Sequence, residues 1–110
     1  MDDRRQHSRQ ATPFVIEVSD LHSGRRLGRL VDLSEEGFML ASELPPEADT
    51  LWECRLQLDA PVEGVTEVRL GADCLWSRPG EGGQSGWCGF QIIDLADDQA
   101  EALAVLLRNA

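Results

Sequence analysis

Hydrophobic and polar residues alternate with a period of two over most of the chain. Because successive side chains of a β-strand point to opposite faces, this alternation predicts half-buried strands. Two shorter candidate strands lie at about residues 25–33 and 37–41. The four clearest apolar series are Phe14, Ile16 and Val18; Trp52, Cys54, Leu56 and Leu58; Val68, Leu70, Ala72 and Cys74; and Cys88, Phe90 and Ile92.

Clusters of turn-forming residues separate these six predicted strands. The clusters contain Gly, Pro, Asp, Ser and Glu, and they lie at 20–24, 35–37, 45–46, 61–64 and 79–83. The connections are short and none has a helical pattern, so neighbouring strands are expected to pair antiparallel and close into a barrel. We therefore predict an all-β fold, a six-stranded antiparallel β-barrel.

The two ends of the chain break the alternation. Residues 1–11 are polar and aperiodic, which predicts a flexible N-terminal arm, and 12–110 is then one barrel domain. A C-terminal helix is predicted over 97–108, with Asp97 as its N-cap and Arg108 in its last turn, plugging or flanking the barrel. Its apolar face consists of Ala100, Leu103, Leu106 and Leu107.

The charge distribution limits the classes of partner. The chain has ten Arg, no Lys and twenty acidic residues, for a net charge of −10. Residues 1–32 carry +1 and residues 33–110 carry −11. A body this acidic repels long polyanions, so we expect no DNA or RNA partner. A small anion held by a few local arginines is compatible with this balance.

Cellular location follows from what the sequence lacks. No apolar run reaches the length of a membrane span, and the N-terminus has no signal-peptide pattern. The three cysteines are an odd number without metal-ligand spacing. We therefore expect a cytoplasmic protein without membrane insertion and without a metal site.

Residues able to support catalysis are few. His7 lies in the polar arm and His22 in a predicted turn, and neither has a nucleophile or acid beside it in a recognisable motif. The glycines at 80–83 lie between two strands, not between a strand and a helix as in a phosphate-binding loop. We expect neither an enzyme nor a cofactor. The cysteines mostly fall on predicted core faces as small hydrophobes: Cys54, Cys74 and Cys88.

Two motifs carry the functional information. Residues 5–9 read RxxxR, preceded by Arg4, and residues 32–37 read DxSxxG. The first motif alone is uninformative, because residues 25–29 also read RxxxR. The second is expected by chance in roughly one chain of this length in thirty. With both motifs in this order and strand context, the chain resembles the PilZ family, bacterial domains that bind cyclic di-GMP, over essentially its whole length.

The resemblance implies a PilZ-type barrel closed by a C-terminal helix, with cyclic di-GMP as its ligand. In that family RxxxR lies in an arm just before the first strand, and DxSxxG lies at the junction of the next two strands. The residues implied in binding are Arg4, Arg5, Arg9, Asp32, Ser34 and Gly37.

The chemistry of the ligand fits these residue types. Cyclic di-GMP carries two phosphate charges and two guanines, each with an O6/N7 acceptor edge and an N1–H/N2–H donor edge. Arginines match the phosphates and the acceptor edge. Asp32 and Ser34 can accept from the donor edge, or Asp32 can hold an arginine. Gly37 permits close approach of a base or a positive φ.

Each motif also has a structural interpretation. Asp32, Ser34 and Gly37 are residue types that close ordinary hairpin turns. Trp76 could stack on a guanine, and some single-domain family members have an aromatic residue there, but alternation from Cys74 favours the core. Trp52 and Trp87 are expected to be structural. The second RxxxR and its neighbour are expected on a solvated strand surface: Arg25, Arg26 and Arg29.

We predict a receptor that relays the cyclic di-GMP signal to an effector protein in trans through ordering of its arm. One alternative is a PilZ-like adaptor that binds a protein partner and has weak or no affinity for cyclic di-GMP. A third, lower-ranked alternative is an enzyme that acts on a nucleotide.

Overall fold

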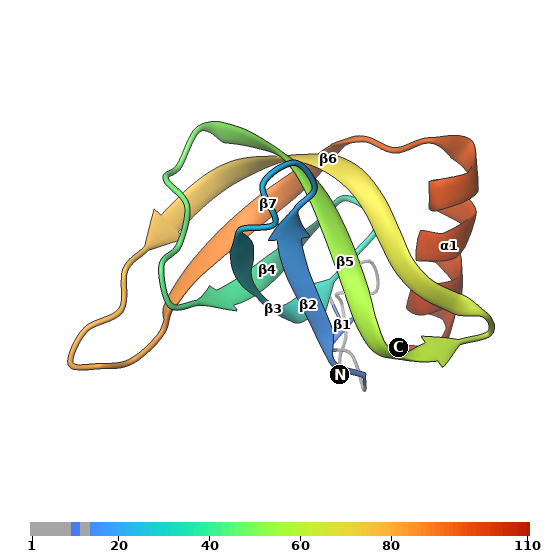
Figure 1. The fold of residues 1–110 in the computed structure, drawn as a ribbon, viewed down its shortest axis with the longest axis horizontal. Coiled ribbons are helices and arrows are strands. Elements are labelled where there is room, and N and C mark those ends of the chain that lie inside the picture. The colour runs from blue at the N-terminus through green and yellow to red at the C-terminus, as the bar shows by residue number, and fades with distance from the viewer. Residues whose placement is uncertain (1–9, 12–13) are drawn as a thin grey trace, which may run out of the picture.

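The computed structural model describes residues 10–11 and 14–110, which form a closed antiparallel barrel with one helix at its end (Figure 1). Six strands make the barrel, in the hydrogen-bonded order β3-β2-β5-β6-β7-β4, and pairing of β3 with β4 closes it. The predicted fold class is confirmed. The elements of the described residues are β1 (Gln10–Ala11), β2 (Ile16–Asp20), β3 (Arg26–Leu33), β4 (Gly37–Ser42), β5 (Thr50–Val62), β6 (Val65–Arg78), β7 (Gly86–Asp94) and α1 (Asp97–Arg108).

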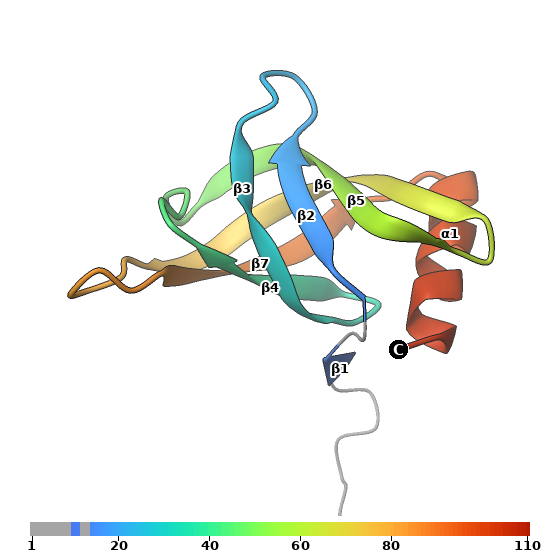
Figure 2. The same cartoon turned by 60° about the horizontal axis from the view of Figure 1, so that its bottom comes forward.

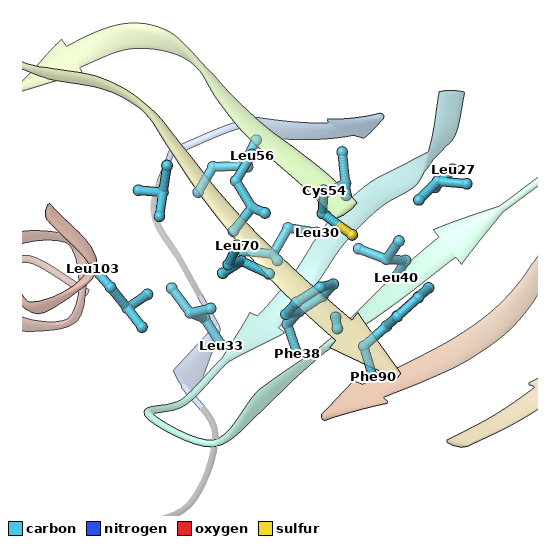
Figure 3. Close-up of a cluster of buried hydrophobic side chains, with 14 of the residues drawn as sticks. Leu27, Leu30, Leu33, Phe38, Leu40, Cys54, Leu56, Leu70, Phe90 and Leu103 are labelled. Carbon is cyan, nitrogen blue, oxygen red and sulfur yellow. The ribbon is translucent and has the colours of Figure 1, made fainter. Parts of the chain in front are cut away.

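The apolar members of the alternating series fill the barrel. Leu56, Val68 and Phe90, each from a different strand, are almost completely buried. Phe38 stacks on Phe90 with 5.0 Å between ring centroids, which joins β4 to β7 through the core (Figure 3). Burial of one face of each of the six barrel strands is the main stabilising contribution in a sheet closed on itself.

Helix α1 flanks the barrel and covers one end of it. Leu103 is directed at the same cluster as Leu33 and Leu70 (Figure 3), and Leu106 is also buried. The prediction of Asp97 as N-cap is wrong: Ala96 occupies that position without a side-chain cap, and Asp97 lies in the first turn. A carboxylate there still interacts favourably with the helix dipole.

Polar contacts fix the helix against the long β5–β6 hairpin, beside which it lies in Figure 1. Arg108 Nη2 donates to Glu63 Oε1 at 2.9 Å, and Asn109 Nδ2 donates to Glu63 Oε2 at 2.7 Å. These hydrogen bonds lower the pKa of Glu63. At the other end of the helix, Gln99 Oε1 accepts a hydrogen bond from the backbone N–H of Arg69 at 2.7 Å.

Strand β1 is an element that the polar N-terminal segment did not predict. Gln10 pairs with Leu33, and Ala11 pairs with Asp32, at the end of β3 that leads into the β3–β4 turn (Figure 2). The remaining part of the predicted arm, residues 1–9, lies outside the described residues, and so do Arg4, Arg5, His7 and Arg9.

The three cysteines are buried and free, as expected of small hydrophobes. Desolvation raises the pKa of Cys54 and of Cys88 to about 12, and it also raises the pKa of Cys74. At pH 8 only about one Cys54 or Cys88 thiol in ten thousand is then a thiolate, which is the form that reacts.

Iodoacetamide at pH 8 is therefore expected to leave Cys54 and Cys88 unmodified in the native protein and to alkylate all three cysteines in urea, as measured by mass spectrometry. Unfolded thiols ionise near pH 8.5, so folding stability should fall as the pH rises from there toward 12. Rapid native labelling would contradict the closed barrel.

Candidate ligand-binding site

A β-bulge in β3 places Asp32 on the outer face of the barrel. Leu30 pairs with Leu40 and Asp32 pairs with the next residue of β4, Met39, so Val31 is the extra residue. Without the bulge, Asp32 would face the same way as buried Leu30. The bulge instead aligns it with Met39, and the Asp32 side chain is partly buried with its Oδ1 atom shielded from solvent.

A second bulge, in β6, does the same for Trp76. Cys74 pairs with buried Phe90, and Trp76 pairs with the next residue of β7, Gly89, so Leu75 is the extra residue. The expectation that Trp76 faces the core is wrong, because alternation from Cys74 breaks at the bulge. The Trp76 indole lies over Gly89: a Cβ added to Gly89 would overlap its Nε1 and Cε2 atoms.

The two bulges create one cross-strand row on the outer face. Asp32, Met39, Gly89 and Trp76 are successive partners across β3, β4, β7 and β6, and the backbone of β1 at Ala11 pairs with Asp32 at one end of the row. Three strand spacings separate Asp32 from Trp76, roughly 14 Å measured along the sheet. The row therefore joins a carboxylate and an indole, which the sequence separates by more than forty residues, to the strand that directly follows RxxxR.

Ser34 organises the β3–β4 turn. Its Oγ atom accepts hydrogen bonds from the backbone N–H groups of Glu36 and Gly37, both at 3.2 Å, and its own N–H donates to the Gly37 carbonyl at 2.9 Å. The turn interpretation of DxSxxG thus holds for Ser34. A direct contact between Ser34 and a guanine stays a prediction.

Gly37 is needed because β7 lies against it. A Cβ at this position would overlap the backbone carbonyl oxygen of Phe90. The alternative reason for a glycine here, a positive φ, is wrong, because Gly37 is not among the described glycines with positive φ. The motif glycine permits close approach of the β7 backbone, and the turn is tied there by the Ile92 N–H, which donates to the Glu36 carbonyl at 2.7 Å.

A second row on the same face contains groups that sequence reasoning did not assign to the site. Arg29, Ala41, Trp87 and Arg78 are successive partners across β3, β4, β7 and β6. Trp87 is 41% exposed on this face, and its expected structural role stays a prediction. The sequence contained a signal for the exposure of Trp87: it directly precedes Cys88, which is buried, so alternation places Trp87 on the outer face. The sequence also contained a signal for the bulge at Val31. Leu30 and Leu33 are both apolar but three residues apart, which a regular strand would place on opposite faces.

The arginines of the second RxxxR, Arg25 and Arg29, and their neighbour Arg26 lie on the solvated surface, as predicted. Arg26 Nε is 2.7 Å from Glu17 Oε1, and Arg25 lies over the Trp52 ring, with 5.3 Å between its guanidinium carbon and the ring centroid. His22 is also exposed, with Nε2 2.6 Å from Glu53 Oε1.

The described residues contain neither a metal-binding cluster nor a membrane-spanning helix. Within 10–11 and 14–110, no group of three or more His, Cys, Asp or Glu side chains is arranged to hold a metal ion. No helix in the same ranges is both long and apolar enough to cross a bilayer.

Comparison with known proteins supports the resemblance seen in the sequence. The family model described as PilZ domain matches residues 3–109. No curated protein matches the chain significantly.

Solved structures share the fold. The chain is similar to the Bacillus subtilis inhibitor of motility MotI/DgrA, with TM-score 0.67 and 14% identity over 97% of this chain and 51% of that one. It is similar to K. pneumonia MrkH in its apo state, with TM-score 0.70 and 15% identity over 99% and 52%. The PilZ domain of CeSA from a cellulose-synthesising bacterium gives TM-score 0.62 and 17% identity over 92% and 96%. The chain spans about half the length of the first two.

Proposed function

The chain belongs to the PilZ domain family, and on this basis we propose that it is a receptor for cyclic di-GMP that relays the signal to a partner protein. PilZ domains are non-catalytic receptors that generally bind this messenger. Membership in the family confirms the prediction that the chain is not an enzyme.

The cross-strand row from β1 to Trp76 is the observation that carries this proposal. Ala11 is the partner of Asp32, and Arg9 is only two residues before Ala11 in the chain. The strand that directly follows the arginines in the sequence therefore lies beside the Asp32 end of the row, and the indole stands at the other end. Arginine donors suit the phosphates and the O6/N7 edges, and an indole suits a guanine face.

In this proposal the ligand bridges the arm to the barrel. Arg4, Arg5 and Arg9 supply donors from the arm, and Asp32 either accepts from a guanine N1–H/N2–H edge or orients one of these arginines. Ordering of residues 1–9 around the ligand then changes the shape of the N-terminus, which a partner protein can recognise. Ser34 and Gly37 contribute by holding the turn beside the ligand, where both are close enough to Asp32 in the sequence to contact the ligand as well.

Isothermal titration with cyclic di-GMP, with GTP as the matched control, tests the proposal. We expect mid-nanomolar to micromolar affinity for cyclic di-GMP, about 8 to 10 kcal/mol, and much weaker binding of GTP. Absence of both heat and thermal shift at high protein concentration would reject the receptor in favour of the adaptor with little affinity for the messenger.

Replacement of Trp76 by Ala is expected to weaken cyclic di-GMP binding about tenfold, because stacking of a base on an aromatic ring contributes about 1–3 kcal/mol. Gly89→Ala should weaken binding by a similar factor although Trp76 itself is unchanged, because the new methyl group displaces the indole. Leu75→Ala, at the exposed bulge residue next to Trp76, is the control and should leave the affinity unchanged. Equal affinities for all four proteins in calorimetry would remove Trp76 from the site.

A further inference from the structure

A groove in the barrel wall is separate from the proposed cyclic di-GMP site. It has a volume of about 490 Å³ and is lined by residues from the end of β2, the start of β5, the middle of β6 and the end of β7. Strands β2, β5 and β6 lie side by side in this wall (Figure 2). None of the lining residues belongs to the row from Asp32 to Trp76.

The groove exposes apolar side chains that the barrel does not need for its core. Leu51 is 71% exposed and Ile93 is 54% exposed, and both line the groove. Ile93 is the extra residue of a bulge, because Gly71 pairs with Asp94 and Ala72 pairs with Ile92. Gly71 keeps the space open, since a Cβ there would lie 3.0 Å from the Asp94 Cβ atom. Exposed apolar groups around a concave surface are typical of interaction sites.

The charged groups of the groove determine what it can receive. Three carboxylates line it, those of Asp20, Glu53 and Asp94, and the one basic side chain in the lining is His22, which is hydrogen-bonded to Glu53. Hydrogen bonds from Ser23 hold the pKa of Asp20 below its ordinary value. An acidic or nucleotide partner would be repelled from this surface, whereas Arg or Lys side chains would be attracted.

We propose that this groove docks a partner protein through a basic segment in which Arg or Lys residues neighbour aliphatic ones. The cationic groups bind Asp20, Glu53 and Asp94, and the aliphatic side chains bury Leu51 and Ile93. The net charge of −11 over residues 33–110 steers such a segment to the barrel.

The groove is connected to the β3–β4 turn by backbone contacts. Gly37 pairs with Gln91, and the N–H of Ile92, the residue directly before the groove residues Ile93 and Asp94, donates to the Glu36 carbonyl at 2.7 Å. A ligand that shifts the turn would therefore shift the groove wall. This dependence on ligand rests on the proposed function, whereas docking itself does not.

The test uses a dye-labelled octapeptide with two Arg–Leu pairs separated by Gly, titrated with the full chain and followed by fluorescence anisotropy. Asp94→Lys is compared with Glu81→Lys, an exposed site in the β6–β7 loop that causes the same change in net charge. Leu51→Ser is compared with Leu44→Ser, at a residue that is 76% exposed and does not line the groove. Thermal unfolding checks that each variant is folded.

Docking at the groove predicts at least tenfold weaker peptide binding for Asp94→Lys and Leu51→Ser, and less than a twofold change for the two controls. Equal losses of peptide affinity in the groove variant and its control would mean diffuse attraction to an acidic protein and would overturn the proposal. Absence of binding at millimolar peptide would also overturn it. So would self-association of the chain through the groove. Titrations with and without cyclic di-GMP separate the two proposals. A groove that binds equally well in both cases retains its role but loses its connection to the ligand.

Discussion

Cyclic di-GMP affinity is expected to fall at least about 100-fold when residues 1–9 are removed. The deletion takes away Arg4, Arg5 and Arg9, and a hydrogen bond to a charged group contributes about 1.5–3 kcal/mol, so the loss of two such bonds already costs about 3 kcal/mol. Every described strand and the helix lie within 10–110. The truncated chain should therefore unfold as cooperatively as the full chain, and calorimetry with the ligand measures the loss.

Single substitutions distinguish specific arginine contacts from general positive charge. Arg5→Ala and Arg9→Ala should each weaken binding roughly tenfold or more. Arg26→Ala is the control of equal charge, because its guanidinium is paired with Glu17 on the solvated surface. An equal loss for Arg26→Ala would mean that only diffuse charge matters.

Hydrogen exchange tests the bridge between arm and barrel. We expect ligand to add protection to residues 4–9 and 32–37 together. Ordering the arm costs about 1–2 kcal/mol per residue, which the arginine contacts must exceed, so affinity should also fall with rising salt. Strong protection of 4–9 in the free protein would refute the relay.

Gly37→Ala is expected to lower the free energy of unfolding by about 3 kcal/mol. The new methyl group would overlap the Phe90 carbonyl oxygen, which is backbone and cannot rotate away, so β4 must separate from β7. Overpacking of this kind costs about 1–3 kcal/mol, and loss of neighbouring ladder hydrogen bonds adds to it. Urea denaturation monitored by tryptophan fluorescence gives the difference.

Gly24→Ala is the matched control. Gly24 has φ +79° and nothing within 4 Å of an added Cβ, so its replacement costs only about 1–2 kcal/mol of backbone strain. If Gly37→Ala were no more harmful than Gly24→Ala, the motif glycine would not be explained by the packing of β7, and a direct ligand contact would become its better explanation.

Alternation of apolar and polar residues was sufficient to predict the six barrel strands, and helical spacing was sufficient to predict the helix, because each pattern is a local property that burial of one face imposes on an element. The helix range 97–108 was predicted from the spacing of its apolar face and agrees with the structure. The two motifs were also readable, since their order and spacing do not depend on how the strands pair.

The faces of Asp32 and Trp76 depended on the tertiary structure. Bulges at Val31 and Leu75 reverse the direction of the side chains that follow. A bulge depends on how two strands pair, and it leaves only a weak signal in the sequence of either strand alone. For the same reason β1 was missed: two residues carry no period, and only pairing with Leu33 and Asp32 defines that strand.

The roles of small motif residues were likewise decided by contacts between distant segments. The sequence by itself determined that Ser34 and Gly37 belong to a turn, because their residue types favour one. Only the closed barrel decided that Gly37 must accommodate the Phe90 carbonyl and that Ile92 is bonded to the turn. Local propensity specifies elements, whereas the tertiary structure specifies which backbones meet: β4 pairs with β7 although Gly37 and Gln91 are 54 residues apart in the sequence.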